Sequence, residues 1–396
     1  MLRPGTSPED LRRDVREWCA SHVPTDWRER LRGAGHDELV TFLRWWATEL
    51  RDAGLLAPHW PEQWGGGFSI AEQVVIAEEL ARGDVPRNAL AHVALYNVAP
   101  TVLHSATEAQ CRTILPGIMR GDVWCQGFSE PDAGSDLASL QTRAVRDGDD
   151  YIVTGQKVWT SWAMEADWCM LLVRTDADAP KHKGISCLTL DMRTPGVEVH
   201  PITQATGSAD FCEVFLDEVH VPVANRIGAE NDGWGVAQGT LAAERAIVVL
   251  EMTERLRRNG IAAAVRGAAS WRRENGTPVL HDDACREMLA ECHAEAEVLR
   301  HLLNRLIEEV ITGADVGGTS AIIKVFYTEL LAKLMREVTD LQGVAAQVDQ
   351  PLLECAGWET GFWMIDYVHS FGWAIGGGTS EIMRNVIGER MLGLPR

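Results

Sequence analysis

Apolar residues recur at three- and four-residue intervals through the first third of the chain, a pattern typical of amphipathic helices. The segments PEDLRRDVREWCASHV, DELVTFLRWWATELRDAGL and IAEQVVIAEELARG all have this spacing, and TEAQCRTILPGIMRGD predicts a further short helix. Ser7 stands before the first segment as a cap, followed by proline and two acids. PHWPEQWGGG is predicted as a loop. We expect these elements to form an N-terminal helical domain over residues 1–122.

The period changes to two after Val123, where β-branched residues and turn signals take over. The segments RDGDD and DADAPKHKG are predicted as turns. This pattern favours a compact β-domain, or small barrel, over residues 123–229. Its predicted strands are YIVTGQKVWTS, DWCMLLVRTD, GISCLTLDM and CEVFLDEVHVP.

Helical spacing returns in the last third, beginning with a long predicted helix from about Trp234 to Asn259. Two more helices are expected at about 281–312 and 317–347, a loop and helix at 350–371, and a final helix near Ser380. The predicted fold is therefore α+β: an N-terminal helical domain, a central β-barrel-like domain, and a C-terminal four-helix bundle over residues 230–396.

Charge and cysteine content narrow the class of protein. The net charge of −20 argues against a nucleic-acid partner, although local cations can still serve an anionic small substrate. Nine cysteines stand at scattered spacings without CxxC or HExxH, which favours reduced thiols, a cytoplasmic location and no metal site. The N-terminal segment lacks the apolar run of a signal peptide, and no apolar stretch is long enough to span a membrane.

The segment SEPDAGSD, residues 129–136, concentrates hydroxyls, acids, a proline and a glycine between an apolar stretch and the predicted strands. These residue types are turn formers, and a loop with no further role is one interpretation. The other is that the hydroxyls and backbone amides hold a flat heteroaromatic ring or a pyrophosphate.

The wider sequence around this loop resembles the acyl-CoA dehydrogenase family. WCQGFSEPDAGSDLASLQTRAVRDGDDYIVTGQKVWTSWAMEADWCMLLVRTD resembles the family's flavin-binding signature, GGGTSEIMRNVIGERMLG resembles its C-terminal signature, and HWPEQWGGGFSIAEQVVIAEELAR resembles its N-terminal region. The resemblance covers nearly the whole chain. It implies the same three-part fold, with FAD held between the β-domain and the bundle, and the absence of GxGxxG is consistent with it.

The resemblance also implies roles for individual residues toward FAD. Phe128 and Ser129 match positions that contact the isoalloxazine ring, and Trp159 and Ser161 match positions beside it. The alternative interpretation of Trp159 is an aromatic side chain in the core of a strand.

The resemblance implies further contacts. Ser135 matches a position that touches FAD phosphate or the substrate's pantetheine, and Thr379, Ser380 and Glu381 match positions near the adenosine. Arg272 matches an arginine that reaches the pyrophosphate of FAD in a neighbouring subunit; its alternative interpretation is a solvated helix end.

The family reaction needs a carboxylate that removes the α-proton of a thioester, and the resemblance leaves one candidate. Most members carry this Glu in a Tyr-Glu-Gly-Thr run, where the present chain has Gly377, which cannot act as a base. Other members carry it on the first bundle helix, where Glu244 matches and Arg245 follows as in the family. The apolar neighbours Leu241, Ile247 and Val248 place Glu244 on a buried face. A buried ion pair is the alternative role, and Glu251 is the reserve base.

The glycines at 376 and 377 predict a wide substrate site. Their missing side chains leave room for a branched, cyclic or bulky acyl group, and the Gly377 N–H is a candidate partner for the thioester carbonyl. We assign Ser135, Arg245, Gly376 and Gly377 to substrate binding. The alternative is that the glycines only shape a turn. The nearby Trp358, Trp363 and Trp373 either line this space or pack the bundle.

Two further segments bear on substrate and assembly. Lys181, His182 and Lys183 lie where the family places the CoA phosphates, although such a loop is also a common solvated turn. An acyl-carrier thioester would not need these contacts. In DLQGVAA, Gly343 matches a flavin-facing glycine of a partner subunit, while Asp340 and Val344 replace the family's Gln and second Gly. A homo-oligomer, dimer or tetramer, is expected, and a heteromer stays open.

The resemblance implies an FAD-dependent acyl-CoA dehydrogenase that passes electrons to an electron-transferring flavoprotein. Two alternatives stay open at this point. One is a flavin oxidase or monooxygenase of the same fold. The other is a non-catalytic subunit that stabilises an active relative, which Gly377 favours and Glu244 opposes.

Overall fold

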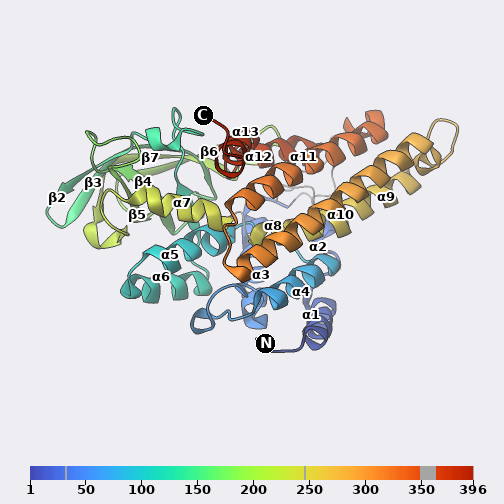
Figure 1. Ribbon diagram of the computed structural model, residues 1–396, viewed down its shortest axis with the longest axis horizontal. Helices are drawn as coiled ribbons and strands as arrows, with labels where there is room; N and C mark the ends of the chain where they lie inside the picture. Colours follow the sequence, from blue (N-terminus) through green and yellow to red (C-terminus); the bar gives the residue numbers. More distant parts are fainter. Residues whose placement is uncertain (32–33, 245–246, 348–362, 396) are drawn as a thin grey trace. The chain divides into compact units, whose positions relative to one another are not determined.

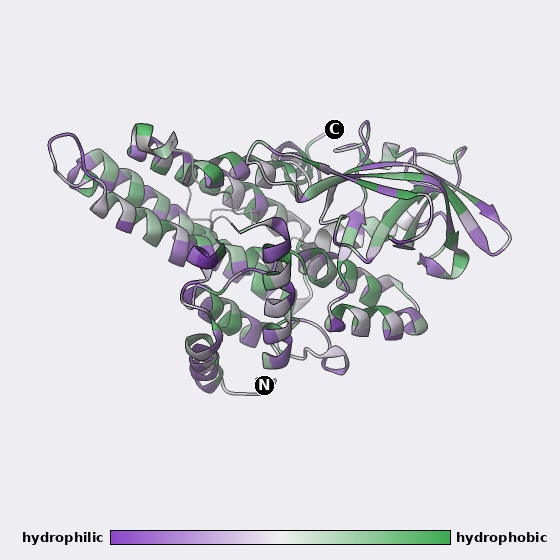
Figure 2. Ribbon diagram, turned by 180° about the vertical axis from the view of Figure 1, so that it is seen from behind, coloured by the Kyte–Doolittle hydropathy of each residue, from purple (hydrophilic) through white to green (hydrophobic). Residues whose placement is uncertain are grey.

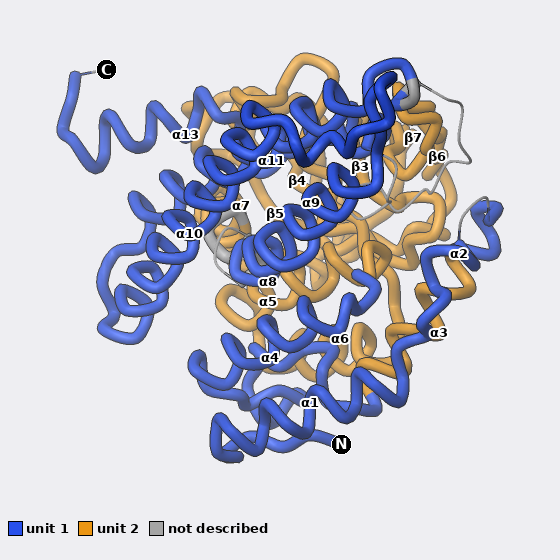
Figure 3. Tube along the Cα trace, turned by 90° about the vertical axis from the view of Figure 1, so that its right-hand side faces the viewer, with its two compact units in different colours: residues 1–39, 52–87, 245–396 blue, residues 40–51, 88–244 orange. Residues whose placement is uncertain are grey.

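The computed structural model describes residues 1–31, 34–244, 247–347 and 363–395 (Figure 1). Within these ranges the chain separates into two compact units (Figure 3). The helical unit comprises Met1–Leu39, Asp52–Arg87 and Arg245–Arg396, and the sheet unit comprises Val40–Arg51 and Asn88–Glu244. The α+β class predicted from the sequence is confirmed, with helical parts at both ends of the chain and a sheet between them.

The sheet unit is built on eight strands in the order β6-β7-β3-β2-β4-β5-β8, with β1 paired to β4 in parallel. The long strands β3 and β7 pair antiparallel through most of their length. The predicted turn RDGDD lies between β2 and β3, with Gly148 at a positive φ of 61°. The strands are β1 (Trp124–Gly127), β2 (Arg143–Asp147), β3 (Asp150–Ser161), β4 (Trp168–Arg174), β5 (Ile185–Asp191), β6 (Val197–Ile202), β7 (Phe211–Pro222) and β8 (Arg226–Ile227).

Alternating side chains of these strands form the core of the sheet unit. Tyr151 and Val153 on β3 face Val219 and Val221 on β7, and all four are buried. The hydropathy colouring of Figure 2 follows this pattern, because the strands are hydrophobic along their middle and hydrophilic toward the hairpin tips. The eight described cysteines are all buried, and none forms a disulfide.

Three helices and a π-helical turn pack within the sheet unit. The π-helix η2 (Ala94–Val98) continues directly into α5 (Ala99–Ser105), which packs on α6 (Glu108–Arg120) and α7 (Gly233–Glu244). A buried hydrogen bond of 2.6 Å joins the hydroxyls of Thr101 on α5 and Thr240 on α7. Since Thr240 stands one turn before Glu244, this bond holds the helix end that carries the candidate base.

The helical unit contains the remaining helices. Ser7 caps the first of them as predicted, and Ser69 forms a capping box with Glu72 at the start of α4. The long helices α10 and α11 pack against each other (Figure 1), and α11 also packs on α12 and α13. Its helices are α1 (Pro8–His22), α2 (Trp27–Leu31), α4 (Ile70–Arg82), α8 (Ile247–Arg255), α9 (Ile261–Ser270), α10 (Asp283–Thr312), α11 (Gly317–Gln342), α12 (Trp363–Ile375) and α13 (Ser380–Val386); α3 (His36–Ala53) contributes to both units.

The predicted helix from Trp234 to Asn259 was wrong at its C-terminal end. After α8 the chain forms a π-helical turn, η5 (Leu256–Gly260), and then continues into α9 as far as Ser270. Gly260, which follows the predicted end at Asn259, is buried with φ −61° and ψ −57°, which is ordinary helical backbone. Packing of this segment against its neighbours therefore overrides the weak helix preference of glycine.

None of the described helices combines the length and the apolar character that crossing a bilayer requires.

The Thr101–Thr240 pair yields a test of how α5 and α7 are held together. We expect Thr240→Val and Thr101→Val each to lower the free energy of unfolding by about 1 kcal/mol, because each leaves a buried hydroxyl with one partner fewer. The double variant should lose less than the sum of the two. Urea unfolding measures all three, and strictly additive losses would show that the hydroxyls do not interact.

Candidate active site

The loop that follows β1, residues 128–142, is closed by its own backbone and is called the SEPD loop below. Glu130 and Ala133 exchange both of their N–H···O bonds at 3.1 Å, which makes a tight turn around Pro131 and Asp132. Phe128 is buried, Ser129 is half-buried and Ser135 is exposed at the outer end of the loop. The predicted ring-contacting residues therefore lie at the inner end of the loop.

A fully buried ion pair holds the SEPD loop against the sheet. Lys157 on β3 is 0% exposed, and its Nζ donates to Glu130 Oε1 at 2.8 Å and to the carbonyl oxygen of Phe128 at 3.2 Å. Glu130 also accepts the backbone N–H groups of Gln141 and Thr142, at 2.5 and 2.8 Å. One carboxylate thus ties both ends of the loop to β3.

The pKa values of this pair follow from burial and from its hydrogen bonds. Burial disfavours the charged form of Glu130, but the charge of Lys157 and the donated hydrogen bonds outweigh it and hold the pKa of the carboxyl below its usual value. Burial lowers the pKa of the Lys157 ammonium, and Glu130 opposes that shift. The short Nζ–Oε1 contact and the donated N–H groups give each member of this buried pair its hydrogen-bond partners.

Trp159 is presented to solvent by an irregularity in β3. Its φ is 59°, in the left-handed region that a large side chain rarely adopts, and the β3–β7 register shifts between Lys157 and Thr160. The ring is 58% exposed and meets Phe211 edge-on. Val158 N–H donates to Ser129 O at 3.0 Å, so the SEPD loop lies beside this bulge. A strained backbone that exposes an indole is a recurrent sign of a binding surface.

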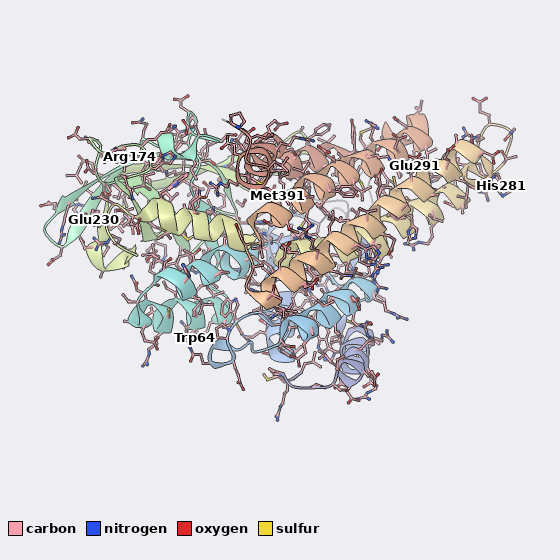
Figure 4. The ribbon with its side chains drawn as sticks, viewed as in Figure 1. Trp64, Arg174, Glu230, His281, Glu291 and Met391 are labelled. Atoms are coloured by element: carbon pink, nitrogen blue, oxygen red, sulfur yellow. The ribbon has the colours of Figure 1, made fainter. Side chains whose placement is uncertain are left out.

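Arg174 fastens the outer end of the SEPD loop to the neighbouring turn. Its guanidinium donates to the carbonyl oxygens of Ala138 and Leu140 on one side and of Lys181 and Lys183 on the other, at 2.6 to 3.4 Å. Figure 4 labels Arg174 within the sheet unit. The Lys181 ammonium pairs with Asp136 of the SEPD loop at 2.8 Å. Its charge is thus already engaged within this chain, and His182 lies against Trp234.

Five predicted site residues of the helical unit lie where α12 ends, namely Gly376, Gly377, Thr379, Ser380 and Glu381. Gly377 and Gly378 have φ values of 65° and 95°, which allow the sharp turn into α13. Thr379 caps α13 by accepting the N–H of Ile382 at 3.2 Å. Ser380 is buried, and its hydroxyl has no hydrogen-bond partner within the described ranges. Glu381 is exposed, and its own N–H, then the Thr379 hydroxyl, lower the pKa of its carboxyl.

Arg272 and Gly343 lie apart from this turn. Arg272 is exposed at the end of α9 and donates to the carbonyl oxygens of Ala269, Ser270 and Trp271. Gly343 is exposed, has φ 59° and ends α11. Their roles toward a neighbouring subunit stay predictions.

Of the two candidate bases, the structure describes the side chain of Glu251 but not that of Glu244. Glu244 is the last residue of α7, and its side chain, like Arg245 and the side chains of Leu241, Ile247 and Val248, lies outside the described part. Glu251 on α8 accepts from Arg255 Nε at 2.9 Å and lies 4.0 Å from Arg87. An acid held by an arginine is a poor proton acceptor, so Glu244 is the stronger candidate. Trp358 also lies outside the described residues.

Sequence reasoning missed Lys157 and Arg174 as parts of this site. Lys157 stands at an inward position of β3, two residues apart from Gly155 and four from Val153, and a lysine at such a position requires a buried acid. That signal was visible in the strand pattern. Arg174 gave no such signal, because its acceptors are carbonyl oxygens of two distant turns.

Sequence models of the acyl-CoA dehydrogenase family match almost the whole chain. The N-terminal domain matches residues 7–122, the middle domain residues 125–219 and the C-terminal domain residues 231–392. The chain therefore belongs to the acyl-CoA dehydrogenase family, whose members are flavoprotein oxidoreductases, and is an acyl-CoA dehydrogenase by class.

Individual relatives refine this picture. FadE34, an acyl-CoA dehydrogenase of Mycobacterium tuberculosis, is 41% identical over 88% of this chain, and the chain spans only 46% of FadE34. The crystal structure of the ChsE4-ChsE5 complex from the same organism is 33% identical with a TM-score of 0.80, covering 100% of both chains. A structure titled Tcur3481-Tcur3483 steroid ACAD is 31% identical with a TM-score of 0.82, again over 100% of both chains.

The residues present fit a flavin. An exposed indole beside a half-buried serine offers a flat surface with a hydrogen-bonding edge, and the unpartnered hydroxyl of Ser380 offers a polar contact elsewhere. Phosphates of a dinucleotide are anions, and hydroxyls and backbone N–H groups are their usual partners. The described residues contain no cluster of His, Cys, Asp and Glu that would hold a metal ion.

The Glu130–Lys157 pair can be tested without any substrate. We expect Lys157→Met to lower the free energy of unfolding by about 3–5 kcal/mol, since it leaves a buried carboxylate unpaired. Adding Glu130→Gln should restore much of the loss, because the amide still accepts one backbone N–H. Chemical unfolding and flavin binding of the three variants check this. A double variant no more stable than Lys157→Met would contradict it.

Proposed function

We propose that this protein removes two hydrogens from the α and β carbons of an acyl-CoA, with FAD as cofactor and Glu244 as the base. The observation that carries the proposal is the exchange of base positions: the turn after α12 has Gly377 where most members carry their Glu, while Glu244 ends the helix that carries it in the others. A chain that had lost catalysis would need neither a glutamate at position 244 nor an ordered SEPD loop.

The residues proposed to hold FAD come from the central β-domain and from the C-terminal helical part of the chain. Phe128, Ser129, Trp159 and Ser161 contact the ring, and Ser135 reaches a phosphate of FAD or the pantetheine of the substrate. FAD, when bound, supplies at N5 the acceptor for the hydride that leaves the β-carbon. Thr379, Ser380 and Glu381 lie near the adenosine, and Arg272 and Gly343 act toward the flavin of a neighbouring subunit.

The proton chemistry belongs to the chain's own residues. The carboxylate of Glu244 takes the α-proton, and the product is the α,β-unsaturated thioester. An α-proton is a weak acid, so a hydrogen bond to the thioester carbonyl and exclusion of water must assist its removal. Ser135, Arg245, Gly376 and Gly377 are proposed as the substrate contacts.

The glycine turn supports a wide acyl group. A Cβ on Gly376 would come within 4 Å of one atom of the described chain, the carbonyl oxygen of Gly372 at 3.4 Å. The position therefore has open space where most family members carry a tyrosine. A related structure is titled a steroid ACAD, and a polycyclic acyl group fits both observations.

Assembly and electron transfer are proposed as follows. The chain forms an oligomer, and a second, unlike chain is favoured, because Asp340 and Val344 depart from the family's flavin-facing pattern and a relative is titled as a complex of two chains. Electrons leave through an electron-transferring flavoprotein, and the protein acts in the cytoplasm. Native mass spectrometry of the chain, first alone and then mixed with a second acyl-CoA dehydrogenase chain, distinguishes a homo-oligomer from a heteromer.

Glu244→Gln tests the base directly. The variant should bind FAD as the wild type does, yet lose substrate-dependent bleaching of the flavin by about 10²–10⁴-fold, since the amide cannot accept the proton. Anaerobic stopped-flow absorbance measures the bleaching. Glu251→Gln is the matched control. This variant should be less stable, because the charged contact with Arg255 is lost, but it should bleach the flavin as the wild type does. Wild-type bleaching in Glu244→Gln would rule out this base.

Gly376→Val tests the width of the site. Since the backbone at Gly376 does not need a positive φ, the variant should fold and bind flavin. It should lower kcat/KM for cyclic acyl-CoA by about tenfold or more, and for a short linear acyl-CoA much less, because the added methyls occupy the open space. Equal losses for both substrates would argue against a wide site.

A further inference from the structure

A cluster of two arginines and one glutamate lies in the helical unit beside the end of α4. Arg255 is 2% exposed and donates from Nε to Glu251 Oε1 at 2.9 Å and from Nη1 to the carbonyl oxygen of Val85 at 2.7 Å. The guanidinium of Arg255 is thus directed at a carboxylate and a helix-flanking carbonyl. Its partners explain why it is tolerated in the interior.

Arg87 is the second arginine, and its position has no such explanation. Its side chain is only 20% exposed, and its Nε lies 4.0 Å from Glu251 Oε1, beyond hydrogen-bonding distance. Within the described residues its guanidinium makes no hydrogen bond, although the group carries five donors. Glu251 is shared with Arg255, which holds it at the shorter distance. Among the described residues, the charge of Arg87 is thus paired only with Glu251, and only at this longer distance.

Trp373 on α12 lies next to Arg87. The Arg87 guanidinium carbon lies 5.8 Å from the centroid of the Trp373 ring. The indole Nε1 is buried and has no acceptor among the described residues. Trp373 stands one helical turn before Gly377, so its indole N–H and the neighbouring guanidinium lie next to the turn assigned to the substrate.

A purely structural explanation accounts for part of this arrangement. Stacking of a guanidinium on an indole is favourable. It does not provide an acceptor for the indole N–H, and burying a donor without an acceptor is destabilising. Phenylalanine at 373 would keep the stacking and avoid that cost, so the indole N–H is in place for a ligand.

We propose that Arg87 and Trp373 recognise a hydrogen-bond-accepting oxygen on the acyl group, at the end remote from the thioester. The ligand class is an acyl-CoA with a distal ketone or carboxylate, both of which present an sp² oxygen to N–H donors. The inference rests on the proposed function for the identity of the substrate. It adds that the acyl site is wide near the thioester and polar at its far end.

The test uses matched thioesters that differ only at the distal end. Hexanoyl-, 5-oxohexanoyl- and adipoyl-CoA form one set, and decanoyl-, 9-oxodecanoyl- and sebacoyl-CoA a second, longer set. Dissociation constants are measured by calorimetry on the flavin-loaded protein in its native assembly, and KM and kcat by anaerobic bleaching. The oxygenated members of at least one set should bind about tenfold or more tighter than the apolar member. A carboxylate preference over the ketone would identify charge as the main contribution, and equal preference the shared oxygen.

Trp373→Phe is the decisive variant, because it removes one N–H and keeps the ring. The ligand-free protein should be as stable as the wild type or more so, since a buried unpaired donor disappears. The preference for the oxygenated thioesters should fall several-fold, through KM rather than kcat. Trp363→Phe, on the same helix, is the matched control and should leave the preference unchanged. Arg87→Lys should weaken the preference for the ketone, and Arg87→Met should abolish that for the carboxylate.

The outcomes separate this inference from the proposed function. Bleaching by all thioesters with no preference for oxygen, or a preference that survives Trp373→Phe, overturns the inference and leaves the dehydrogenase proposal intact. Oxygen-dependent binding that Trp373→Phe weakens, without bleaching, supports the site and counts against the catalytic proposal. Failure of every oxygenated thioester to bind overturns the inference as well.

Discussion

The buried pair of Glu130 and Lys157 is the constraint on which the sheet side of the site depends. A charged lysine inside a sheet is stable only where its partner is fixed, and here the partner is the acid of the SEPD loop. The same carboxylate receives two backbone N–H groups from the far end of the loop. The loop is thus ordered before any ligand arrives, and Ser129 is held beside the bulge that exposes Trp159. Preorganisation of this kind lowers the entropic cost of binding a rigid ring.

The helical unit contributes a different property, which is room combined with polarity. The turn at 376–378 replaces large side chains by glycine. One turn earlier the indole N–H of Trp373 has no acceptor among the described residues, and the guanidinium of Arg87 lies beside it. A small linear acyl group would satisfy neither feature. A wide group with a distal oxygen would satisfy both, so the two observations point to one kind of substrate although they rest on different residues.

Most of the fold was predictable because its signals are local. The cap at Ser7, the final helix beginning at Ser380, the turn at Gly148 and the four named strands follow from residue type and spacing, and all are present. The short strands β1, β2, β6 and β8 were not named. β2 has no clear alternation of apolar residues, whereas Val197 and Val199 of β6 alternate with Glu198 and His200 over only four residues. The end of the helix after Trp234 was misplaced, because Gly260 is held helical by packing that no local pattern encodes.

For the site, the sequence alone identified residues with suitable chemistry. It showed that Gly377 cannot be a base and that the SEPD loop is rich in hydroxyls, and its resemblance to the family pointed to Glu244 as the candidate base. The way in which these groups are held became visible only in the folded chain: Lys157 pairs with the SEPD loop, Arg174 bridges two turns, Asp136 engages Lys181, and Arg87 lies against Trp373. These contacts join residues far apart in the chain, and their strength depends on burial and distance, which a residue's local neighbours do not set.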